Sequence, residues 1–231
     1  RSTLLASSAA SDVYKRQKEI CATEVFTLTD TVSYKHLIPG KEYLLVGTLM
    51  DKSTGKPLLL DGKEIHAETV FTPETPNGTV TVSFTFDSRL IKENTSLVVF
   101  ETLYKDGKEL AVHADINDNG QTVKVKVPEI GTKATVDGKK EVTASGRVKI
   151  EDVVSYKNLT PGKEYAVKGV LMNKATGEPL LADTKEIRSS FTFKPDKPDG
   201  EINITFVFDA SGLKTATEIV VFETLYRDDT E

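Results

Sequence analysis

The sequence predicts an all-β protein made of two tandem β-sandwich domains, each incomplete at one end. The first observation is an internal repeat: shifted by 122 positions, roughly 45 of the 92 residues from Lys18 to Glu109 meet an identical residue. The second is the alternation of apolar and polar residues in short segments such as 79–86. The third is turn chemistry such as Asn77-Gly between these segments. No window favours a long helix, and copies of roughly 110 residues fit immunoglobulin-like sandwiches.

Composition excludes several classes of function. The net charge of -5 and the scattered lysines argue against nucleic-acid binding, which needs a concentrated basic face. No apolar run approaches the roughly 18 residues of a membrane span. The single cysteine, Cys21, cannot form an internal disulfide. We therefore expect no nucleic acid, no membrane insertion and no cofactor.

The domain limits follow from the repeat. Residues 1–17 show no sustained periodicity and lack the layout of a signal peptide, so we expect a leader that is disordered or foreign to the fold. The first sandwich then covers residues 18–128 and lacks its opening strand. The second covers residues 129–231 and stops before a counterpart of the last strand. The chain is thus expected to be a fragment of a longer array.

The opening strand of the second copy carries a threonine among apolar residues. In this segment Ile130, Thr132, Ala134 and Val136 share one face. Thr132 is therefore expected to point inward. Its equivalent in the first copy, at the same shift of 122 positions, is Ala10, which has no hydroxyl.

The last strand of the first copy carries a glutamine on its apolar face. Alternation places Gln121 with Val123, Val125 and Val127, and the lysines between them on the other face. Burying an amide without a partner costs roughly 1 to 3 kcal/mol. An inward Gln121 therefore needs a reason.

Each copy also carries a glutamate on the apolar face of a predicted strand. Glu101 and Glu223 lie in two identical segments, Val-Val-Phe-Glu-Thr-Leu-Tyr, where each shares a face with apolar neighbours. A glutamate in a core favours its protonated form and can polarise an amide oxygen. Attack by an inward threonine hydroxyl on the glutamine side chain would then expel ammonia and leave an ester.

Ordinary structural roles are the alternative for each residue. A buried glutamine can bond the backbone, inward threonines are common, and the glutamates can face solvent or cap a strand end. His36 and His66 align with Asn158 and Arg188, so imidazole is not required there, whereas His113 has no counterpart to test it.

A calcium site is a second alternative. Residues 115–120 match the first half of an EF-hand loop, but position twelve is Lys126 where a bidentate glutamate is needed. We therefore predict no metal. A tight turn at Asn119-Gly120 accounts for the same residues.

Four motifs together resemble the Thr-Gln ester-bond domain, also called the VaFE repeat, over Lys18 to Glu231. They are Val98-Val-Phe-Glu, Asp30-Thr-Val-Ser-Tyr, Pro39-Gly-Lys-Glu-Tyr and His113-x-Asp-x-x-Asp-x-x-Gln-Thr. The resemblance implies an immunoglobulin-like sandwich in the stalk of a cell-wall anchored surface adhesin of Gram-positive bacteria. It also implies a spontaneous intramolecular ester that stabilises each complete repeat and forms once, so the protein is not a turnover enzyme. Its partners would be neighbouring repeats, with a host or matrix ligand bound by other domains.

The resemblance also implies roles for individual residues. Gln121 would be the acyl donor and His113 the proton-transfer residue, with Glu101 and Asp118 as acidic helpers and Asp115 as a substitute for Asp118. In the second copy Thr132 would be the nucleophile and Glu223 the helper.

This chain departs from the pattern in both copies. Ala10 stands where the first copy needs a threonine, and the second copy stops before its glutamine. We therefore predict no intradomain ester in this chain. A bond from Thr132 to Gln121 is not expected, because ten residues separate them and each belongs to a different sandwich. An extracellular ligand-binding module without a cross-link is the alternative function, which an exposed aromatic cluster would favour; none stands out.

Overall fold

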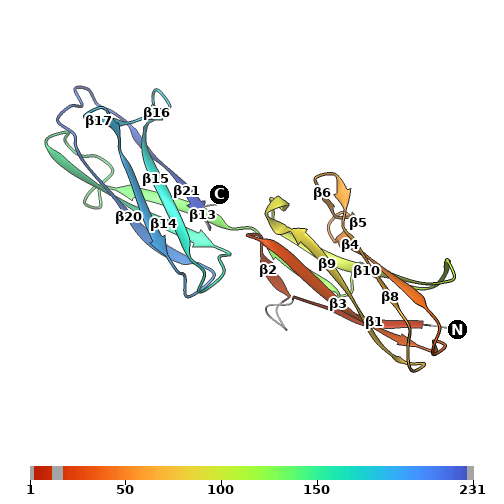
Figure 1. Cartoon of the computed structure of the whole chain (residues 1–231). Helices are drawn as coiled ribbons and strands as arrows, with labels where there is room; N and C mark the ends of the chain where they lie inside the picture. Colours follow the sequence, from red (N-terminus) through yellow and green to blue (C-terminus); the bar gives the residue numbers. More distant parts are fainter. Residues whose placement is uncertain (1–2, 12–17, 228–231) are drawn as a thin grey trace. The chain divides into compact units, whose positions relative to one another are not determined.

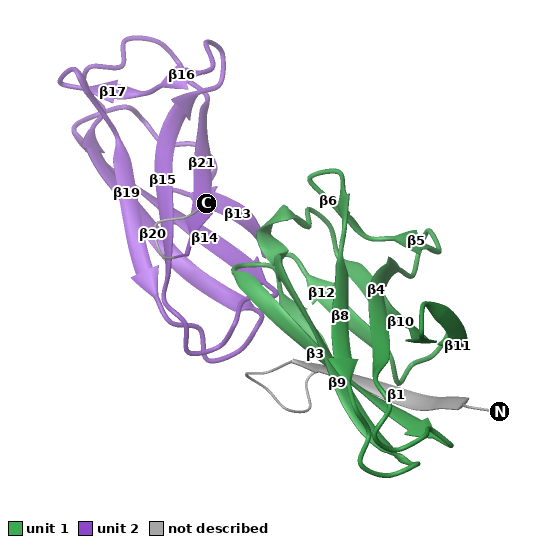
Figure 2. Cartoon of the chain, turned by 45° about the vertical axis from the view of Figure 1, so that its right-hand side comes forward, with its two compact units in different colours: residues 1–127 green, residues 128–231 purple. Residues whose placement is uncertain are grey.

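The computed structural model describes residues 3–11 and 18–227. It divides the chain into two compact units, residues 1–127 and residues 128–231, shown in green and purple in Figure 2. The division lies next to the boundary that the repeat predicts. Among the described residues, strands alternate with turns, and one short 3-10 turn is the helical element. The all-β prediction is confirmed.

Unit 1 contains two main sheets; most of their strands are labelled in Figure 1, and β11 and β12 are labelled in Figure 2. The first has the order β1 (Thr3–Ser11), β3 (Val25–Lys35), β9 (Gly78–Asp87). The second has the order β2 (Glu19–Cys21), β12 (Thr122–Lys126), β10 (Thr95–Lys105), β4 (Tyr43–Asp51), β5 (Lys56–Pro57). Two further strands join it: β11 (Lys108–His113) pairs with β10, and β8 (His66–Phe71) pairs with β4. The remaining elements are β6 (Leu59–Leu60), β7 (Lys63–Glu64) and the turn η1 (Ser88–Leu90).

Unit 2 repeats this plan with fewer strands. Its first sheet has the order β13 (Glu129–Thr135), β14 (Arg147–Lys157), β20 (Gly200–Asp209). Its second has the order β16 (Glu178–Pro179), β15 (Tyr165–Asn173), β19 (Arg188–Phe193), with β21 (Ile219–Tyr226) also paired to β15. A small hairpin joins β17 (Leu181–Ala182) to β18 (Lys185–Glu186). Described counterparts of β2, β11 and β12 are missing from this unit.

The core of each unit lies between its two sheets, because every strand turns alternate residues inward. In β9, Val82, Phe84 and Phe86 are buried, and the residues between them are exposed. The ring of Phe84 packs directly on the backbone of Gly47 in β4: a Cβ there would lie 2.5 Å from the Phe84 Cζ. Glycine is therefore required at this position of β4.

The opening strand of unit 1 corrects the sequence-based expectation. Residues 3–11 form β1 and pair antiparallel with β3, so the prediction of a missing opening strand and of a leader outside the fold is wrong for these residues. The rest of the expected leader lies outside the described residues. Backbone pairing depends little on side-chain identity, so a segment without clear periodicity can still complete a sheet edge.

The register of β1 also corrects the equivalence between the two copies. In unit 2, Thr132 pairs with Val154; in unit 1 the residue paired with the equivalent Val32 is Ser7. Ser7, rather than Ala10, therefore holds the register position of Thr132. The shift of 122 positions assumed a constant chain length, whereas ladder pairing and the irregularity between Leu5 and Ser7 set the register.

Candidate functional site

Gln121 lies fully inside unit 1, as predicted. Its exposed fraction is 0%, and Val123 and Val125 on the same face of β12 are also buried. Neither side-chain atom, Nε2 nor Oε1, has a hydrogen-bond partner. Burying an amide without hydrogen-bond partners costs roughly 1 to 3 kcal/mol. Gln121 therefore stabilises the fold no more than a leucine at the same position would. The alternative, in which the buried Gln121 side chain is hydrogen-bonded to the backbone, therefore does not hold.

Glu101 and His113 form the polar part of the site. Glu101 in β10 is also 0% exposed and pairs across the ladder with His113 in β11. The His113 Nδ1 lies 3.1 Å from the Glu101 Oε2, and its Nε2 lies 3.4 Å from the Asp118 Oδ2. The imidazole therefore connects a buried carboxyl to a carboxyl near the surface. Such a chain can carry a proton between core and solvent.

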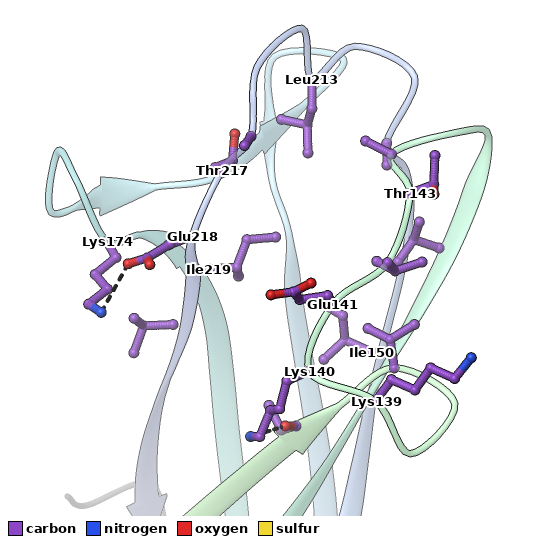
Figure 3. A pocket seen from close by; sticks show the side chains of 18 of the residues that line it. Lys139, Lys140, Glu141, Thr143, Ile150, Lys174, Leu213, Thr217, Glu218 and Ile219 are labelled. Carbon is purple, nitrogen blue, oxygen red and sulfur yellow. Dashed lines mark hydrogen bonds and ion pairs between the residues drawn. The ribbon is translucent and has the colours of Figure 1, made fainter.

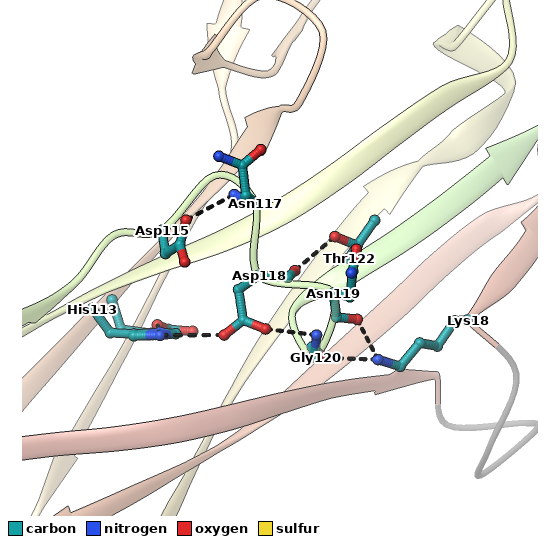
Figure 4. A network of polar contacts seen from close by, with 9 residues as sticks. Lys18, His113, Asp115, Asn117, Asp118, Asn119, Gly120 and Thr122 are labelled. Atoms are coloured by element: carbon teal, nitrogen blue, oxygen red, sulfur yellow. Dashed lines mark hydrogen bonds and ion pairs between the residues drawn. The ribbon is translucent and has the colours of Figure 1, made fainter.

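The two aspartates in the loop before β12 make different contacts (Figure 4). The Asp118 carboxylate accepts from the Gly120 N–H at 2.6 Å while facing His113. Asp115 instead accepts from the Asn117 N–H at 2.9 Å, which shapes the turn. Asp118 is therefore the aspartate that contacts the imidazole, and Asp115 does not take its place.

A lysine closes the same loop. The Lys18 Nζ donates to the carbonyl oxygens of Asn119 and Gly120, the latter at 3.1 Å (Figure 4). Carbonyls that could face a calcium ion thus face an ammonium group. In the described part of the chain, no group of three or more His, Cys, Asp or Glu residues is placed to hold a metal ion.

Sequence reasoning missed a pair of buried aspartates. Asp30 in β3 and Asp152 in β14 are equivalent in the repeat, each is 0% exposed, and neither carboxyl oxygen of either residue has a donor. The sequence does carry a signal for Asp30, because it alternates inward with Leu28 and Val32.

Unit 2 brings its acids together with the threonine. Burial and, after it, the neighbouring Asp152 carboxyl together raise the pKa of Glu223 from 4.5 to about 8, and the hydrogen bond from the Thr132 hydroxyl acts in the opposite direction. With both carboxyls ionised, neither can donate to the other, whereas a protonated Glu223 can donate to Asp152. On β13, Ile130 and Ala134 pack against the core as predicted, whereas Thr132, which was expected to point inward with them, is exposed to solvent.

Each unit therefore displays part of one site. Unit 1 shows the glutamine with His113, and unit 2 shows the threonine. Glu101 and Glu223 occupy equivalent positions in both, opposite Gly47 in β4 and Gly169 in β15. Fold and site together define a class of protein: β-sandwich modules that bury an amide and carboxyls between their sheets and carry a threonine hydroxyl beside them on the opening strand.

The family follows from comparison with known proteins. The model of the family described as "T-Q ester bond containing domain" matches residues 6–125 and 128–231. The chain belongs to this family. The resemblance found from the sequence motifs is thereby confirmed.

Solved structures with a similar fold include a bacterial adhesin from Mobiluncus mulieris containing intramolecular disulfide, isopeptide and ester bond cross-links. In one crystal form it is 15% identical, with 87% of this chain and 76% of that chain covered and a TM-score of 0.48. In another it is 16% identical, with 96% and 80% covered and the same TM-score of 0.48. A protein named BspA_C_mut is 9% identical, with 98% and 95% covered and a TM-score of 0.48. No curated protein matches the chain. No helix among the described residues is long and apolar enough to cross a membrane.

Proposed function

We propose that this chain is part of the stalk of a bacterial cell-surface adhesin, anchored to the cell wall of a Gram-positive organism. Complete repeats of the stalk would cross-link themselves by an ester between a threonine of the opening strand and a glutamine at the last strand. The family membership supports the ester. The observation that carries the proposal is the buried Gln121 amide without partners, in the unit that also buries Glu101.

The chemistry uses residues that the two units supply between them. The threonine Oγ bonds to the glutamine Cδ, the bond from Cδ to Nε2 breaks, and ammonia leaves with the hydroxyl proton. A protonated glutamate at the position of Glu223 polarises the amide oxygen. His113, between Glu101 and Asp118, transfers the proton. The product consumes the reactive pair, so each repeat reacts once and the protein has no external substrate.

The ester would stabilise the domain against unfolding and against mechanical load. It would join the first strand to the last, closing a loop of nearly one domain. By analogy with a disulfide, a loop of about 100 residues is worth on the order of 4.7 kcal/mol in the chain-entropy model. A covalent link between the terminal strands also prevents either strand from being peeled away under load. Neighbouring repeats are then the immediate partners, and host or matrix ligands would bind elsewhere in the adhesin.

A hybrid repeat tests the proposal, because one unit can be completed with the sequence of the other. Residues 128–227 are joined directly to residues 106–127, which continue the repeat in register. The folded hybrid is expected to have an intact mass lower than its sequence mass by one ammonia. Thr132→Ala and Gln121→Leu should each restore the full mass, and Thr132→Ser should keep the loss. A folded hybrid at full mass would refute the ester.

The unaltered chain provides a second measurement. We expect its intact mass to equal its sequence mass, since Thr132 and Gln121 lie in different units. If the chain is lighter by one ammonia and Ser7→Ala abolishes this loss, then Ser7, at the register position of Thr132, acts as the nucleophile in unit 1.

A further inference from the structure

The outer face of the second sheet in unit 1 carries a hydroxyl, an imidazole and a carboxylate in one hydrogen-bonded row. Thr48 of β4 pairs across the ladder with His66 of β8. The Thr48 Oγ1 lies 3.0 Å from the His66 Nδ1, and the His66 Nε2 lies 2.8 Å from the Glu64 Oε2. A nucleophile within hydrogen-bond reach of a base that a third group orients is the signature of an activated hydroxyl. The side chains of His66 and Glu64 are 45% and 46% exposed, so solutes can reach them.

This row is separate from the buried site of the same unit. Gly47 pairs with Glu101, and the next residue along β4, Thr48, pairs with Phe100. Because successive residues of a strand point to opposite faces, Thr48 lies on the outside of the sheet whose inside carries Glu101. The row therefore takes no part in the ester chemistry proposed for the interior.

The carboxylate fixes which imidazole nitrogen can act as a base. An ionised Glu64 only accepts hydrogen bonds, so the Nε2 of a neutral His66 must donate to it. The Nδ1 then keeps its lone pair and accepts from the Thr48 hydroxyl. This tautomer is the one that a general base for Thr48 requires. A cross-strand pair of threonine and histidine needs only the first contact, whereas the second contact sets the direction of both bonds.

The fold does not require these side chains. In unit 2 the three positions are occupied by Val170, Arg188 and Glu186. The Arg188 Nε donates to the Glu186 Oε2 at 2.6 Å, so this sheet closes the same corner with an ion pair. The glutamate is thus kept in both units, but the hydroxyl and the base occur in unit 1 alone. Unit 2 therefore provides a matched sheet without the row.

Unit 2 also provides threonines without a base. A cavity of about 920 Å³ in this unit is lined in part by Thr143 and Thr217 (Figure 3). The Thr217 Oγ1 donates to the Thr215 carbonyl at 3.0 Å. All three histidines of the chain lie in unit 1, so no imidazole of the chain's second unit can activate these hydroxyls. They are internal controls for Thr48.

We propose that Thr48, His66 and Glu64 hydrolyse esters. The Thr48 Oγ1 bonds to the ester carbonyl carbon while its proton passes to the His66 Nδ1. The bond from this carbon to the leaving oxygen breaks, and the leaving oxygen takes the proton from His66. A water molecule then attacks the acyl carbon and gives its proton to the His66 Nδ1, and the Thr48 oxygen leaves and recovers that proton. One ester and one water thus give one acid and one alcohol, so this site turns over, unlike the cross-link of the interior.

The surroundings of Thr48 define the class of ester. Val46 and Phe100 lie next to Thr48 on the same face and are partly exposed, so they offer an apolar seat for the acyl group. Strand β4 is paired on both sides, with β8 and β10, so its amides are used within the sheet and do not bind an oxyanion. Esters with a good leaving group depend least on such donors. The substrate class is therefore an aryl ester with an apolar acyl group.

The experiment uses the full chain with 4-nitrophenyl acetate at fixed pH, and measures nitrophenolate release and acetylation after an acid quench. Peptide mass mapping should find the acetyl group on Thr48 and not on Thr217. Thr48→Val, which introduces the residue of unit 2, should remove this label and lower the rate at least about tenfold. Thr48→Ser should keep both the label and the rate.

Changes at the other two residues test their roles. His66→Gln should abolish the label on Thr48, because it removes the base. Glu64→Gln should lower kcat and leave KM unchanged, since Glu64 contacts the imidazole and not the ester. His36→Asn is the matched control: it removes another exposed imidazole, asparagine stands at the equivalent position of unit 2, and the rate should not change.

Three results would overturn the inference, in variants whose circular dichroism matches that of the unaltered chain. The first is an equal rate for Thr48→Val and the unaltered chain. The second is acetylation confined to His66 or to lysines, which would make Thr48 a bystander. The third is labelling of Thr48 that survives His66→Gln. None of these results bears on the interior ester, which the mass of the hybrid repeat tests separately.

Discussion

Glu223 makes the stability of unit 2 depend on pH in an unusual direction. Its pKa is raised from 4.5 to about 8, first by burial and then by Asp152. Between these two values the folded state holds a proton that the unfolded state releases. The free energy of unfolding therefore falls as the pH rises from about 4.5 to about 8. Most acidic groups act in the opposite direction.

The magnitude follows from the two pKa values with a correction for solvent. Converted in full, the difference between 4.5 and about 8 corresponds to about 5 kcal/mol. Glu223 is only partly buried, so water screens the effect and we reduce it to about 1–2 kcal/mol. Glu223→Gln removes the titrating group and should remove this part of the pH dependence.

The assay is urea denaturation of the full chain at pH 5 and pH 8, followed through NMR signals of unit 2. The unaltered chain should lose about 1–2 kcal/mol more than Glu223→Gln between the two pH values. Glu218→Gln is the control, because the Glu218 side chain is 76% exposed and its loss should leave the profile unchanged. Parallel pH profiles for the unaltered chain and Glu223→Gln would refute the protonated glutamate and the amide activation that depends on it.

Two further changes test the packing around the site. Gln121→Leu should raise the free energy of unfolding of unit 1 by about 1–2 kcal/mol, because it removes two buried polar atoms without partners; a loss of stability in denaturant titrations would contradict this. Gly47→Ala should cost about 1–3 kcal/mol, since the new methyl group would meet the Phe84 ring at 2.5 Å. Gly212→Ala, with no atom within 4 Å of its Cβ position, should stay within about 0.5 kcal/mol in the same titration.

The sequence predicts most of the fold because strand alternation and turn pairs are local signals. The alternation from Gln121 onward places the buried residues of β12 correctly, and the two identical heptapeptides place β10 and β21. The inward position of Glu101 followed from its apolar neighbours in the same way. A period of two residues therefore suffices wherever one face of a strand is buried.

The rest of the site depends on pairing between distant segments. The register of β1, which brings Ser7 opposite Val32, has no local signature in an Ala- and Ser-rich segment. Asp30 was visible as an inward residue, but its role requires knowing that Asp152 lies beside Glu223 in the other unit. The choice of Asp118 over Asp115 depends on how the loop folds back on His113.

The glutamates of the two Val-Val-Phe-Glu-Thr-Leu-Tyr segments differ in exposure, and this difference bears on when the proposed ester could form. With β11 and β12 in place, Glu101 is 0% exposed; without such strands, Glu223 retains contact with water. In the proposed chemistry, strands that exclude water from this position would strengthen a hydrogen bond from the glutamate to the amide oxygen. The same strand delivers the glutamine. In the proposed chemistry, docking of the last strand would therefore both bring the glutamine and strengthen its activation, so that the ester would form only in a sandwich that has already closed.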